Sequence, residues 1–421
     1  MRILIVGSGA REHAIVRALA SESTHHDLVV APGNAGIAAL ARIEPVTATD
    51  PDAVAELAGR LGAELVVIGP EAPLVAGVAD ALRERGIPVF GPSREAAALE
   101  GSKAFAKRIM AAAGVPTGRA VDVLTADALD DALDTTGSPY VVKADGLAAG
   151  KGVLVTEDRA AARAHALRWL EAGPVLLEEY LGGREVSLFF VSDGTLALPL
   201  SPAQDFKRLE DGDAGPNTGG MGAYSPLPWL AEAFGSQEAF VDQVRATIAE
   251  PVIARLAAEG TPFQGLLYCG LVVDGASVKV IEFNARFGDP ETQVVLPRLA
   301  SPLSALLRGA AIGSLAQVPA PEFRAEAAVG VVLASAGYPD TPTLGAAITG
   351  LDDAGALDHV HVDHAATAVD GTDVVTTGGR VLTVVGLGQD IAAARAAAYE
   401  GVGLIRFPGA QRRTDIAEGI A

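Results

Sequence analysis

The sequence predicts a multidomain protein of mixed α/β and α+β class, with a doubly wound parallel-sheet domain first and a mostly β domain last. Three observations lead to this fold class. The chain has 421 residues, enough for about two to four domains. Residues 1–100 alternate short apolar runs with helical patterns, whereas strand patterns dominate from about Gly330. Between these parts, short strands surround single helices, as is typical of an α+β domain.

The first domain is predicted from its strands. Buried strands are expected at Arg2–Val6, Leu28–Val30, Leu65–Ile68 and Pro88–Phe90, and a helix at Glu12–Ala20. The last three strands each end in a Gly/Pro turn. Alternating strands and helices favour a parallel sheet, whose ligands bind at the carboxyl ends of the strands.

A helix is expected next, over about residues 102–113, where Gly114 and Pro116 end it. A small α+β module with one Ala-rich helix, about residues 160–171, should follow. Its strands are expected at Tyr140–Lys143, Gly152–Val155, Val175–Glu178 and Val186–Val191.

The segment 211–228 is rich in Gly and Pro, and a structureless loop of that length is usually functional or disordered. Strands are expected at Leu266–Val273 and Val278–Phe283. In the last part of the chain, Gly378-Gly379 should make a hairpin turn before a strand at Val381–Val385. A final helix is expected to begin near Ile391.

Composition excludes several classes of function. The net charge is −20, and such a surface repels polyanions, so we expect neither nucleic acid nor an anionic membrane as a partner. A local basic cluster for a small phosphorylated substrate stays open. One Cys excludes an internal disulfide and a paired-Cys metal site. The first apolar run is too short for a signal peptide, and no stretch reaches the roughly 18 uncharged apolar residues of a membrane helix, so we expect a cytoplasmic protein with neither feature.

Lysine is scarce, with six Lys among 32 basic residues. Where the chain needs a generic solvated cation it uses Arg, so each Lys is a candidate for a specific role. The six lie between residues 103 and 279, at Lys103, Lys107, Lys143, Lys151, Lys207 and Lys279.

The first Gly-rich turn follows the first strand and contains Gly7, Gly9 and Arg11. A dinucleotide fingerprint would need a third Gly where Glu12 stands and an acidic end to the second strand, so NAD binding is disfavoured. The backbone N–H groups of such a strand–turn–helix unit suit an anion, and Arg11 adds a charged contact. The alternative is a tight turn that only packs the helix on the strand.

A second Gly-rich loop spans residues 143–152 between two predicted strands. It departs from a Walker A loop because three residues separate Gly146 from Gly150 and because Gly152 stands where Ser or Thr is required. With Lys143 and Lys151 at its ends, the loop can fold over a polyphosphate as a lid. The alternative is a simple hairpin with surface lysines. The strand end at residues 177–185 follows, where an adenine edge and ribose hydroxyls could bind.

The segment 280–291 carries the sharpest pattern. On a strand, Glu282, Asn284 and Arg286 alternate onto one face while apolar residues pack the other. Carboxylate and amide oxygens suit Mg²⁺ shared with nucleotide phosphates. Arg286 is placed to stabilise a transferring phosphoryl group.

These residues together resemble the phosphoribosylamine–glycine ligase family, ATP-grasp enzymes of purine biosynthesis. The resemblance runs nearly end to end and is weakest at the C-terminus. One departure is Phe206, where many members carry His, so no acid–base role is expected there. The motifs are VGSGAREHA (6–14), APGNAG (31–36), GPEAPLV (69–75), EGSKAFAK (100–107), VVKADGLAAGKGV (141–153), PAQDFKR (202–208), GPNTGGMGAYSP (215–226) and VIEFNARFGDPETQ (280–293).

The resemblance implies an N-terminal domain over 1–101, an ATP-grasp domain over 102–318 with a lid module at about 117–190, and a C-terminal domain over 319–421. It implies ATP binding by Lys103, Lys143, Gly146, Gly150, Lys151, Gly152, Glu178, Glu179, Tyr180, Leu181, Glu185, Arg208 and Asn217.

The resemblance also implies the remaining roles. Glu282 and Asn284 would hold Mg²⁺ or Mn²⁺, and with Arg286 and Lys143 would form the catalytic set. Phosphoribosylamine would bind at Gly9, Arg11, Glu12, Asn34, Gly36, Glu71 and Pro73. Glycine would bind near Arg286 at Asn217, Thr218, Gly219, Gly220, Met221, Asp289 and Glu291.

The implied reaction joins glycine to 5-phosphoribosylamine through glycyl phosphate, with release of ADP and phosphate. Two alternatives remain. Another ATP-grasp carboxylate–amine ligase would share the lid and the metal strand but not the 215–226 loop. A non-catalytic nucleotide sensor would bind ATP without turnover. We expect a monomer or a weak homodimer.

Overall fold

The computed structural model describes residues 1–146 and 152–420. The N-terminal part is a parallel sheet, as predicted, but it has five strands, in the order β3-β2-β1-β4-β5, where four were expected. Its strands are β1 (Arg2–Gly7), β2 (Asp27–Pro32), β3 (Arg42–Ile43), β4 (Leu65–Ile68) and β5 (Val89–Phe90). Its helices are α1 (Ala10–Ala20), α2 (Pro51–Leu61), α3 (Glu71–Ala76), α4 (Val78–Glu84) and α5 (Arg94–Gly101).

The central strand β1 explains why this sheet is doubly wound. Ile3 and Ile5 pack into one apolar cluster, whereas Leu4 and Val6 pack into another. Successive side chains of a strand point to opposite faces, so both faces of the sheet are buried. The carboxyl ends of its strands therefore remain as the edge at which a ligand can bind.

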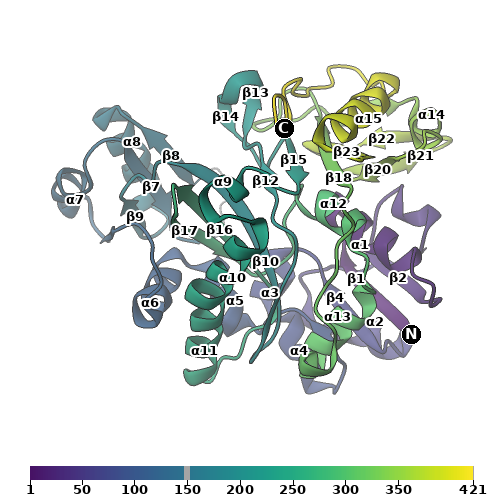
Figure 1. Ribbon diagram of the computed structural model, residues 1–421, viewed down its shortest axis with the longest axis horizontal. Coiled ribbons are helices and arrows are strands. Elements are labelled where there is room, and N and C mark those ends of the chain that lie inside the picture. Colours follow the sequence, from purple (N-terminus) through teal and green to yellow (C-terminus); the bar gives the residue numbers. More distant parts are fainter. Residues whose placement is uncertain (147–151, 421) are drawn as a thin grey trace.

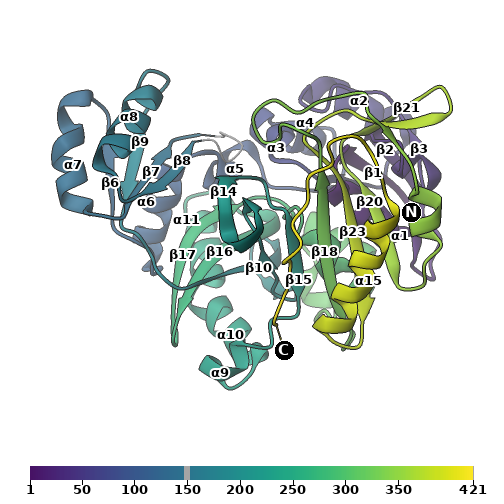
Figure 2. The same ribbon diagram turned by 90° about the horizontal axis from the view of Figure 1, so that it is seen from above.

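The helix α6 (Lys103–Ala113) begins and ends as expected. The Ser102 hydroxyl accepts a hydrogen bond from the Phe105 N–H at 3.2 Å, and Gly114 ends the helix in the left-handed conformation. A small module follows and projects from the rest of the molecule (Figures 1 and 2). Its sheet has the order β6-β9-β7-β8. The strands are β6 (Ala120–Val123), β7 (Tyr140–Ala144), β8 (Val153–Thr156) and β9 (Val175–Glu178).

Two expectations about this module were wrong. It contains two helices, α7 (Leu129–Thr136) and α8 (Arg159–Leu170), where one was expected. The stretch Val186–Val191 belongs to another sheet. It lies in β10 (Arg184–Asp193), which pairs along its whole length with β16 (Gln264–Asp274). The partner of a strand is set by tertiary contacts, which the local sequence does not show.

The larger central sheet has the order β11-β10-β16-β17, with β11 at Ala197–Pro199 and β17 at Ser277–Asn284. A turn at Asp274-Gly275 joins β16 and β17 as a hairpin. The other helices of this region are α9 (Leu230–Phe234), α10 (Gln237–Val244), α11 (Glu250–Ala258), α12 (Thr292–Val295) and α13 (Leu303–Ala311).

The Gly-rich segment 211–228 is not a structureless loop. It contains β14 (Ala214–Asn217), which pairs with β13 (Arg208–Glu210), and β15 (Gly222–Ser225). The strand β15 joins a sheet of order β12-β15-β18-β23-β20. The other strands of that sheet are β12 (Gln204–Asp205), β18 (Ala327–Ala334), β20 (Val360–His364) and β23 (Arg380–Gly388).

The expectation of a hairpin turn at Gly378-Gly379 was wrong. The strand before it, β22 (Asp373–Thr376), pairs with β19 (Ala347–Ile348) and β21 (Thr367–Asp370), whereas β23 pairs with β18 and β20. The last helices are α14 (Leu351–Gly355) and α15 (Ile391–Leu404), the latter as predicted. Among the described helices, none is both long and apolar enough to span a bilayer.

Candidate functional site

Two lysines meet beside the start of the second Gly-rich loop. Lys143 is carried by β7 and is buried, while Lys103 opens α6. The Lys103 ammonium donates to the Gly146 carbonyl at 3.1 Å. Asp145 fastens the two segments, because its carboxylate accepts the Lys103 N–H at 2.6 Å and the Ser102 hydroxyl at 3.2 Å.

A third lysine belongs to this cluster. The buried Glu178 carboxylate lies 2.7 Å from the Lys143 ammonium and 3.3 Å from that of Lys107. Lys107 was not part of the predicted nucleotide set. Its spacing could have indicated this contact, because Lys107 stands four residues after Lys103 and therefore lies on the same face of α6.

The strand β17 carries the predicted metal ligands Glu282 and Asn284 and is called the metal strand for that reason. It faces these lysines. Gly270 lies opposite Glu282 but Leu271 lies opposite Val280, so Ile281 is the extra residue of a β-bulge. The Ile281 carbonyl accepts the Lys143 ammonium at 3.3 Å. The bulge therefore joins the lysine cluster to the strand that carries Glu282.

Charge keeps the carboxyl of Glu282 ionised. Burial alone would raise its pKa, but the ammonium groups of Lys143, Lys207 and Lys103 together hold the pKa below its ordinary value. Burial lowers the pKa of Lys103 in turn, against the attraction of Glu282. The cluster thus places the Glu282 carboxylate, which can bind a divalent metal, beside ammonium groups, which can bind a polyphosphate.

The alternation predicted on this strand is present. Glu282, Asn284 and Arg286 are partly exposed, whereas Phe283 and Ala285 are buried. Among the described residues, no group of three or more His, Cys, Asp or Glu side chains is arranged to hold a metal. Two hard oxygen ligands fit Mg²⁺ or Mn²⁺ when phosphate oxygens and water complete the octahedron.

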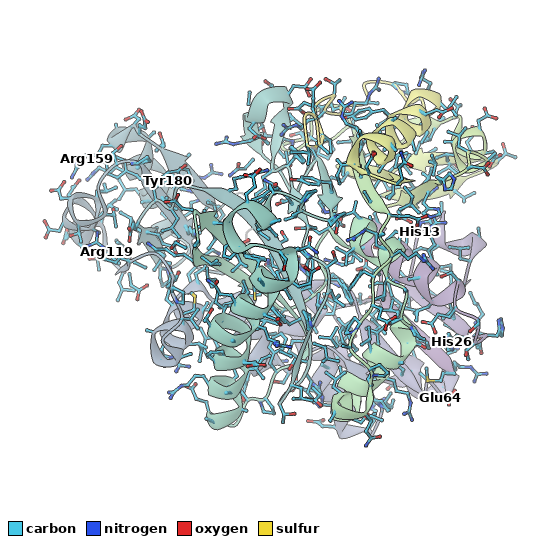
Figure 3. The ribbon with its side chains drawn as sticks, in the orientation of Figure 1. His13, His26, Glu64, Arg119, Arg159 and Tyr180 are labelled. Carbon is cyan, nitrogen blue, oxygen red and sulfur yellow. The ribbon has the colours of Figure 1, made fainter. Side chains whose placement is uncertain are left out.

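The predicted adenine and ribose residues follow β9. The Glu179 N–H donates to the Arg119 carbonyl at 2.8 Å, and Tyr180 is 48% exposed. Figure 3 shows both Arg119 and Tyr180 on the projecting module. The exposed Glu185 pairs with Lys207, whose ammonium also lies 3.7 Å from Asp205. Leu181 is partly buried.

Other residues of the predicted nucleotide set lie on the β13–β14 hairpin and next to the second Gly-rich loop. Arg208 and Asn217 face each other across the β13–β14 hairpin, where the Arg208 guanidinium donates to the Gly215 carbonyl at 2.8 Å. The Gly152 carbonyl accepts the Ala144 N–H at 2.8 Å. Gly150 and Lys151 lie outside the described residues.

The N-terminal turn is fastened by Glu12. Its buried carboxylate accepts the Gly9 N–H at 2.5 Å and the Arg11 guanidinium at 2.6 Å. A Cβ on Gly7 would lie 2.6 Å from the Glu12 Cδ, and one on Gly69 would lie 2.0 Å from its Oε1. Glu12 therefore joins the turns after β1 and β4, where only glycines fit.

Arg286 joins the N-terminal domain to the metal strand. Its guanidinium lies 3.2 Å from Glu71 and 3.0 Å from Glu100, and both Arg286 and Arg11 donate to the Phe287 carbonyl. Burial opposes the ionisation of Glu71, but Arg286 and Arg11 hold its pKa below the ordinary value. Burial raises the pKa of Glu100. Glu100 begins the motif EGSKAFAK, but no role was predicted for it.

Two predicted phosphoribosylamine residues contact the C-terminal domain. The Asn34 amide donates to the His364 carbonyl at 2.7 Å and to the Ser8 carbonyl at 2.8 Å. A Cβ on Gly36 would lie 2.4 Å from the His364 ring and 2.7 Å from that of His13. The turn after β2 is thereby held against the C-terminal domain. Pro73 lies in α3, apart from these contacts.

The predicted glycine residues form two groups. Glu291 is buried and accepts hydrogen bonds from the Tyr268 hydroxyl at 2.9 Å and from Ser187 at 3.1 Å. Asp289 accepts the Gln293 amide at 2.8 Å and lies 3.4 Å from the Arg380 guanidinium. Sequence reasoning did not single out Arg380.

The loop Thr218–Met221 lies against the Asp289 segment. The Thr218 hydroxyl accepts the Gly220 N–H at 3.0 Å and donates to the Lys207 carbonyl. Arg380 donates to the Gly219 carbonyl. Met221 is fully buried against Val332 and Ala334, so its side chain belongs to the core.

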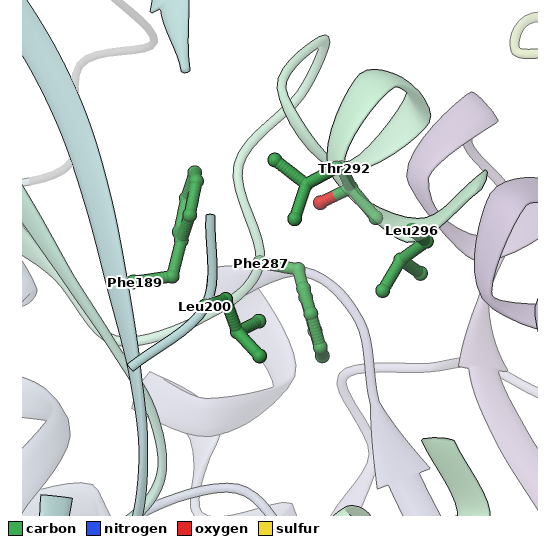
Figure 4. A pocket seen from close by; sticks show the side chains of 6 residues that line it. Phe189, Leu200, Phe287, Thr292 and Leu296 are labelled. Atoms are coloured by element: carbon green, nitrogen blue, oxygen red, sulfur yellow. The ribbon is translucent and has the colours of Figure 1, made fainter. Parts of the chain in front are cut away.

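An apolar pocket lies behind Phe287, beside Phe189, Leu200, Thr292 and Leu296 (Figure 4). Its lining offers one hydroxyl and no charged group. It does not suit the charged substrates of a phosphoryl-transfer site.

Comparison with known proteins agrees with this arrangement. The chain matches the families described as phosphoribosylglycinamide synthetase N domain over residues 1–100, ATP-grasp (A) domain over residues 101–292 and C domain over residues 328–419. It is 63% identical to phosphoribosylamine–glycine ligase of Leifsonia xyli subsp. xyli and 57% identical to that of Streptomyces coelicolor, and each match covers 99% of both chains.

Solved structures give the same result. Phosphoribosylamine–glycine ligase from Thermotoga maritima is 34% identical, with a TM-score of 0.83 over 99% of this chain and 100% of that chain. The biotin carboxylase domain of Hydrogenobacter thermophilus 2-oxoglutarate carboxylase, solved with magnesium ADP, has a TM-score of 0.71 at 16% identity, which shows a common fold alone. The resemblance seen in the motifs is confirmed, and the chain belongs to the phosphoribosylamine–glycine ligase family, with its N, ATP-grasp and C domains.

Proposed function

We propose that the lysine cluster, the metal strand and the turns of the N-terminal domain form one active site. The reaction is that of an ADP-forming carbon–nitrogen ligase of purine biosynthesis, in which ATP drives the joining of glycine to 5-phosphoribosylamine. The observation that carries the assignment is the junction at β17, where Lys143 contacts the bulge beside Glu282 and Arg286 contacts Glu71 of the N-terminal domain.

The chemistry requires activation of glycine. A carboxylate is inert towards amines, so its oxygen first attacks the γ-phosphorus of ATP, which gives glycyl phosphate and ADP. The amine of phosphoribosylamine then attacks the carbonyl carbon, the amide bond forms, and phosphate leaves. The products are glycinamide ribonucleotide, ADP and phosphate, and no side chain needs to act as a nucleophile.

The chain's own residues bind and align the reactants. Lys103 and Lys143 neutralise the phosphates of ATP, and Arg286 neutralises charge on the transferring group. Glu282 and Asn284 would hold Mg²⁺ or Mn²⁺, which when bound withdraws charge from the phosphates. Alignment alone is worth about 7–11 kcal/mol in favourable cases.

The substrates are assigned to two sides of this junction. The turns at Gly9, Asn34 and Glu71 bind phosphoribosylamine, with the N-terminus of α1 and Arg11 as the anion site. Glycine binds on the side of residues 217–222 and Asp289. The domain limits follow the motifs, at 1–101, 102–318 and 319–421, with the lid at about 117–190.

The decisive experiment measures ADP release with purified protein, ATP, Mg²⁺, glycine and freshly generated phosphoribosylamine. ADP formation should need both substrates together. Turnover with another carboxylate and none with glycine would identify a different ATP-grasp ligase. ATP binding without turnover in any substrate pair would indicate a nucleotide sensor.

We further propose a cytoplasmic enzyme that is a monomer or a weak homodimer. The single Cys supports the cytoplasmic location, because it suits a reducing compartment. Sedimentation velocity over a range of concentrations tests the assembly state. A dimer that persists at nanomolar concentration would contradict it.

A further inference from the structure

The backbone of Gly219 is held at both ends by the C-terminal domain. Its N–H donates to the Tyr338 hydroxyl at 2.9 Å, and its carbonyl accepts from the Arg380 guanidinium. The same guanidinium donates to the Asp289 carbonyl at 2.6 Å and lies 3.4 Å from the Asp289 carboxylate. One side chain thus joins two segments that lie 70 residues apart in sequence, from 219 to 289.

The C-terminal domain is built to present these two side chains. Arg380 begins β23, and its position is fixed by pairing with Ala334 of β18. Gly379, just before it, leaves room for Tyr338, since a Cβ there would lie 2.3 Å from the Tyr338 ring. Any other residue at this position would push the ring away from Gly219.

The loop itself needs such a support. Gly219 and Gly220 have no side chains to pack, and Gly220 has φ +106°, which other residues rarely adopt. A glycine-rich loop loses much conformational entropy when it is ordered. If it were free, the substrate would have to supply that ordering free energy on binding, and affinity would fall.

We propose that Arg380 and Tyr338 are positioning residues that hold the loop Thr218–Gly220 against Asp289 and thereby preform the glycine side of the active site. This inference rests on the proposed function, which places glycine at these two segments. The C-terminal domain then determines the affinity for glycine without contacting it. The nucleotide side, at Lys103 and Lys143, does not depend on this contact.

The kinetic signature is a selective rise in the KM for glycine. Arg380→Gln should raise it about tenfold or more, because charge-assisted hydrogen bonds to three acceptors are lost. Tyr338→Phe removes one neutral hydrogen bond and should raise it about threefold. Arg380→Lys keeps the charge but not the planar fork, so it should give a smaller rise than Arg380→Gln. The KM values for ATP and phosphoribosylamine should stay unchanged.

The control is Arg412→Gln, which changes an exposed Arg of the same domain and should leave all constants unchanged. Thermal melting of each variant reports the folded state. If Arg380→Gln fails to fold, Arg380→Lys and Tyr338→Phe carry the test. The double variant Arg380→Lys/Tyr338→Phe should be less than additive in its effect, since both side chains hold the same residue.

Three results would overturn the inference. One is an unchanged glycine KM in folded variants. Another is a rise in the KM for phosphoribosylamine, which would place Arg380 in direct contact with that substrate. A third is a loss of melting temperature with all kinetic constants unchanged. If the unaltered enzyme shows no glycine-dependent turnover, the proposed function fails instead, so the two failures are distinguishable.

Discussion

Glu282 is the residue on which the proposed chemistry depends most. Its carboxylate lies on the partly exposed side of β17 among three lysines, which keep its pKa below the ordinary value. The opposite face of the strand, with Phe283 and Ala285, packs the core. A change at Glu282 therefore alters charge in the site without removing a core side chain.

We expect Glu282→Gln to lower kcat/KM by at least about a hundredfold, because metal binding contributes several kcal/mol to charge stabilisation and each 1.4 kcal/mol is about tenfold. Circular dichroism and the melting temperature should show an intact fold. Glu232→Gln, a change at an exposed Glu of α9, is the matched control. Activity within threefold of the unaltered enzyme would exclude Glu282 as a metal ligand.

At the scale of an element, the β7–β8 connection is the predicted lid over ATP. Lys143 before it and Gly152 after it are described, whereas Lys151 lies outside the described residues. The role of Lys151 stays a prediction from its sequence position in a Gly-rich loop and from the scarcity of Lys. We expect Lys151→Ala to weaken ATP binding about tenfold, the cost of one charged contact to phosphate.

Isothermal titration with ATP and Mg²⁺ measures this effect directly. Arg163→Ala removes a cation from α8 of the same module and should leave the dissociation constant unchanged, since its partner is Asp130 of α7. Equal affinities for all three proteins would refute the lid role of Lys151.

The C-terminal segment and the β13–β14 hairpin form a second connection between elements. The buried Arg413 lies 2.6 Å from Asp213 of the hairpin region and 2.6 Å from Asp415. Its guanidinium also lies over the Phe206 ring, 5.0 Å from the ring centroid. The hairpin that carries Asn217 is therefore held by the end of the chain.

This connection should weaken in acid. Hydrogen bonds from Arg413 lower the pKa of Asp415 from 3.8 to about 2 in the folded protein. A lowered folded pKa adds stability above pH about 4, which is lost as the pH falls towards 2. Asp415→Asn should destabilise the protein by at most about 2 kcal/mol at pH 7, and the difference should shrink below pH 4. Thermal melts of both proteins from pH 7 to 3 measure it, with Asp370→Asn as the exposed control.

The sequence predicted the positions of helices and strands better than it predicted which strands pair with each other. The strand Val175–Glu178 has the bounds expected from its apolar run, because a short buried run between turn residues is a local signal. The placement of Val186–Val191 was wrong because strand pairing is a tertiary property. The helix Leu129–Thr136 was missed because it has only eight residues, although Leu129, Ala132 and Leu133 have the i, i+3, i+4 spacing of a helix face.

The same limit applies to the site. Glu282 and Asn284 could be placed on one face of the strand because alternation along one strand is visible in the sequence. Arg380 and Glu100 contact the site only after the chain has folded: Glu100 meets Ala285 across 185 positions, and Arg380 meets Asp289 across 91. Arg380 stands in no local pattern that would separate it from an ordinary surface charge, and the motif EGSKAFAK, which Glu100 begins, does not indicate a contact with Arg286.

At the scale of the whole molecule, the C-terminal sheet is joined to both other parts. It includes β15 from the central segment, and its strand β20 lies beside α1 of the N-terminal domain (Figure 1). Arg17 of α1 lies 3.1 Å from Asp363 of β20, whose carboxylate is buried. Beside this pair, the His13 ring accepts the His364 N–H at 2.8 Å.

This ion pair differs from those on the surface. Burial raises the pKa of Asp363 to about 6, against the attraction of Arg17, so the carboxylate depends on its partner. Arg17→Ala should destabilise the protein by about 3 kcal/mol, because it leaves a buried carboxyl unpaired. Arg42→Ala breaks the exposed pair with Glu44 and should cost less than about 1 kcal/mol. Comparison of the two unfolding curves tests whether the interface between the domains carries this stability.

The interface should also affect one substrate selectively. The Asn34 turn, assigned to phosphoribosylamine, is held by the His364 carbonyl directly after Asp363. When Arg17→Ala loosens β20, the KM for phosphoribosylamine should rise while that for ATP stays constant, because the lysine cluster belongs to the central domain. Asp363→Asn removes the charge that needs a partner, so adding it to Arg17→Ala should recover part of the lost stability. An additive loss in the double variant would show that the two residues act independently and that the ion pair does not join the domains.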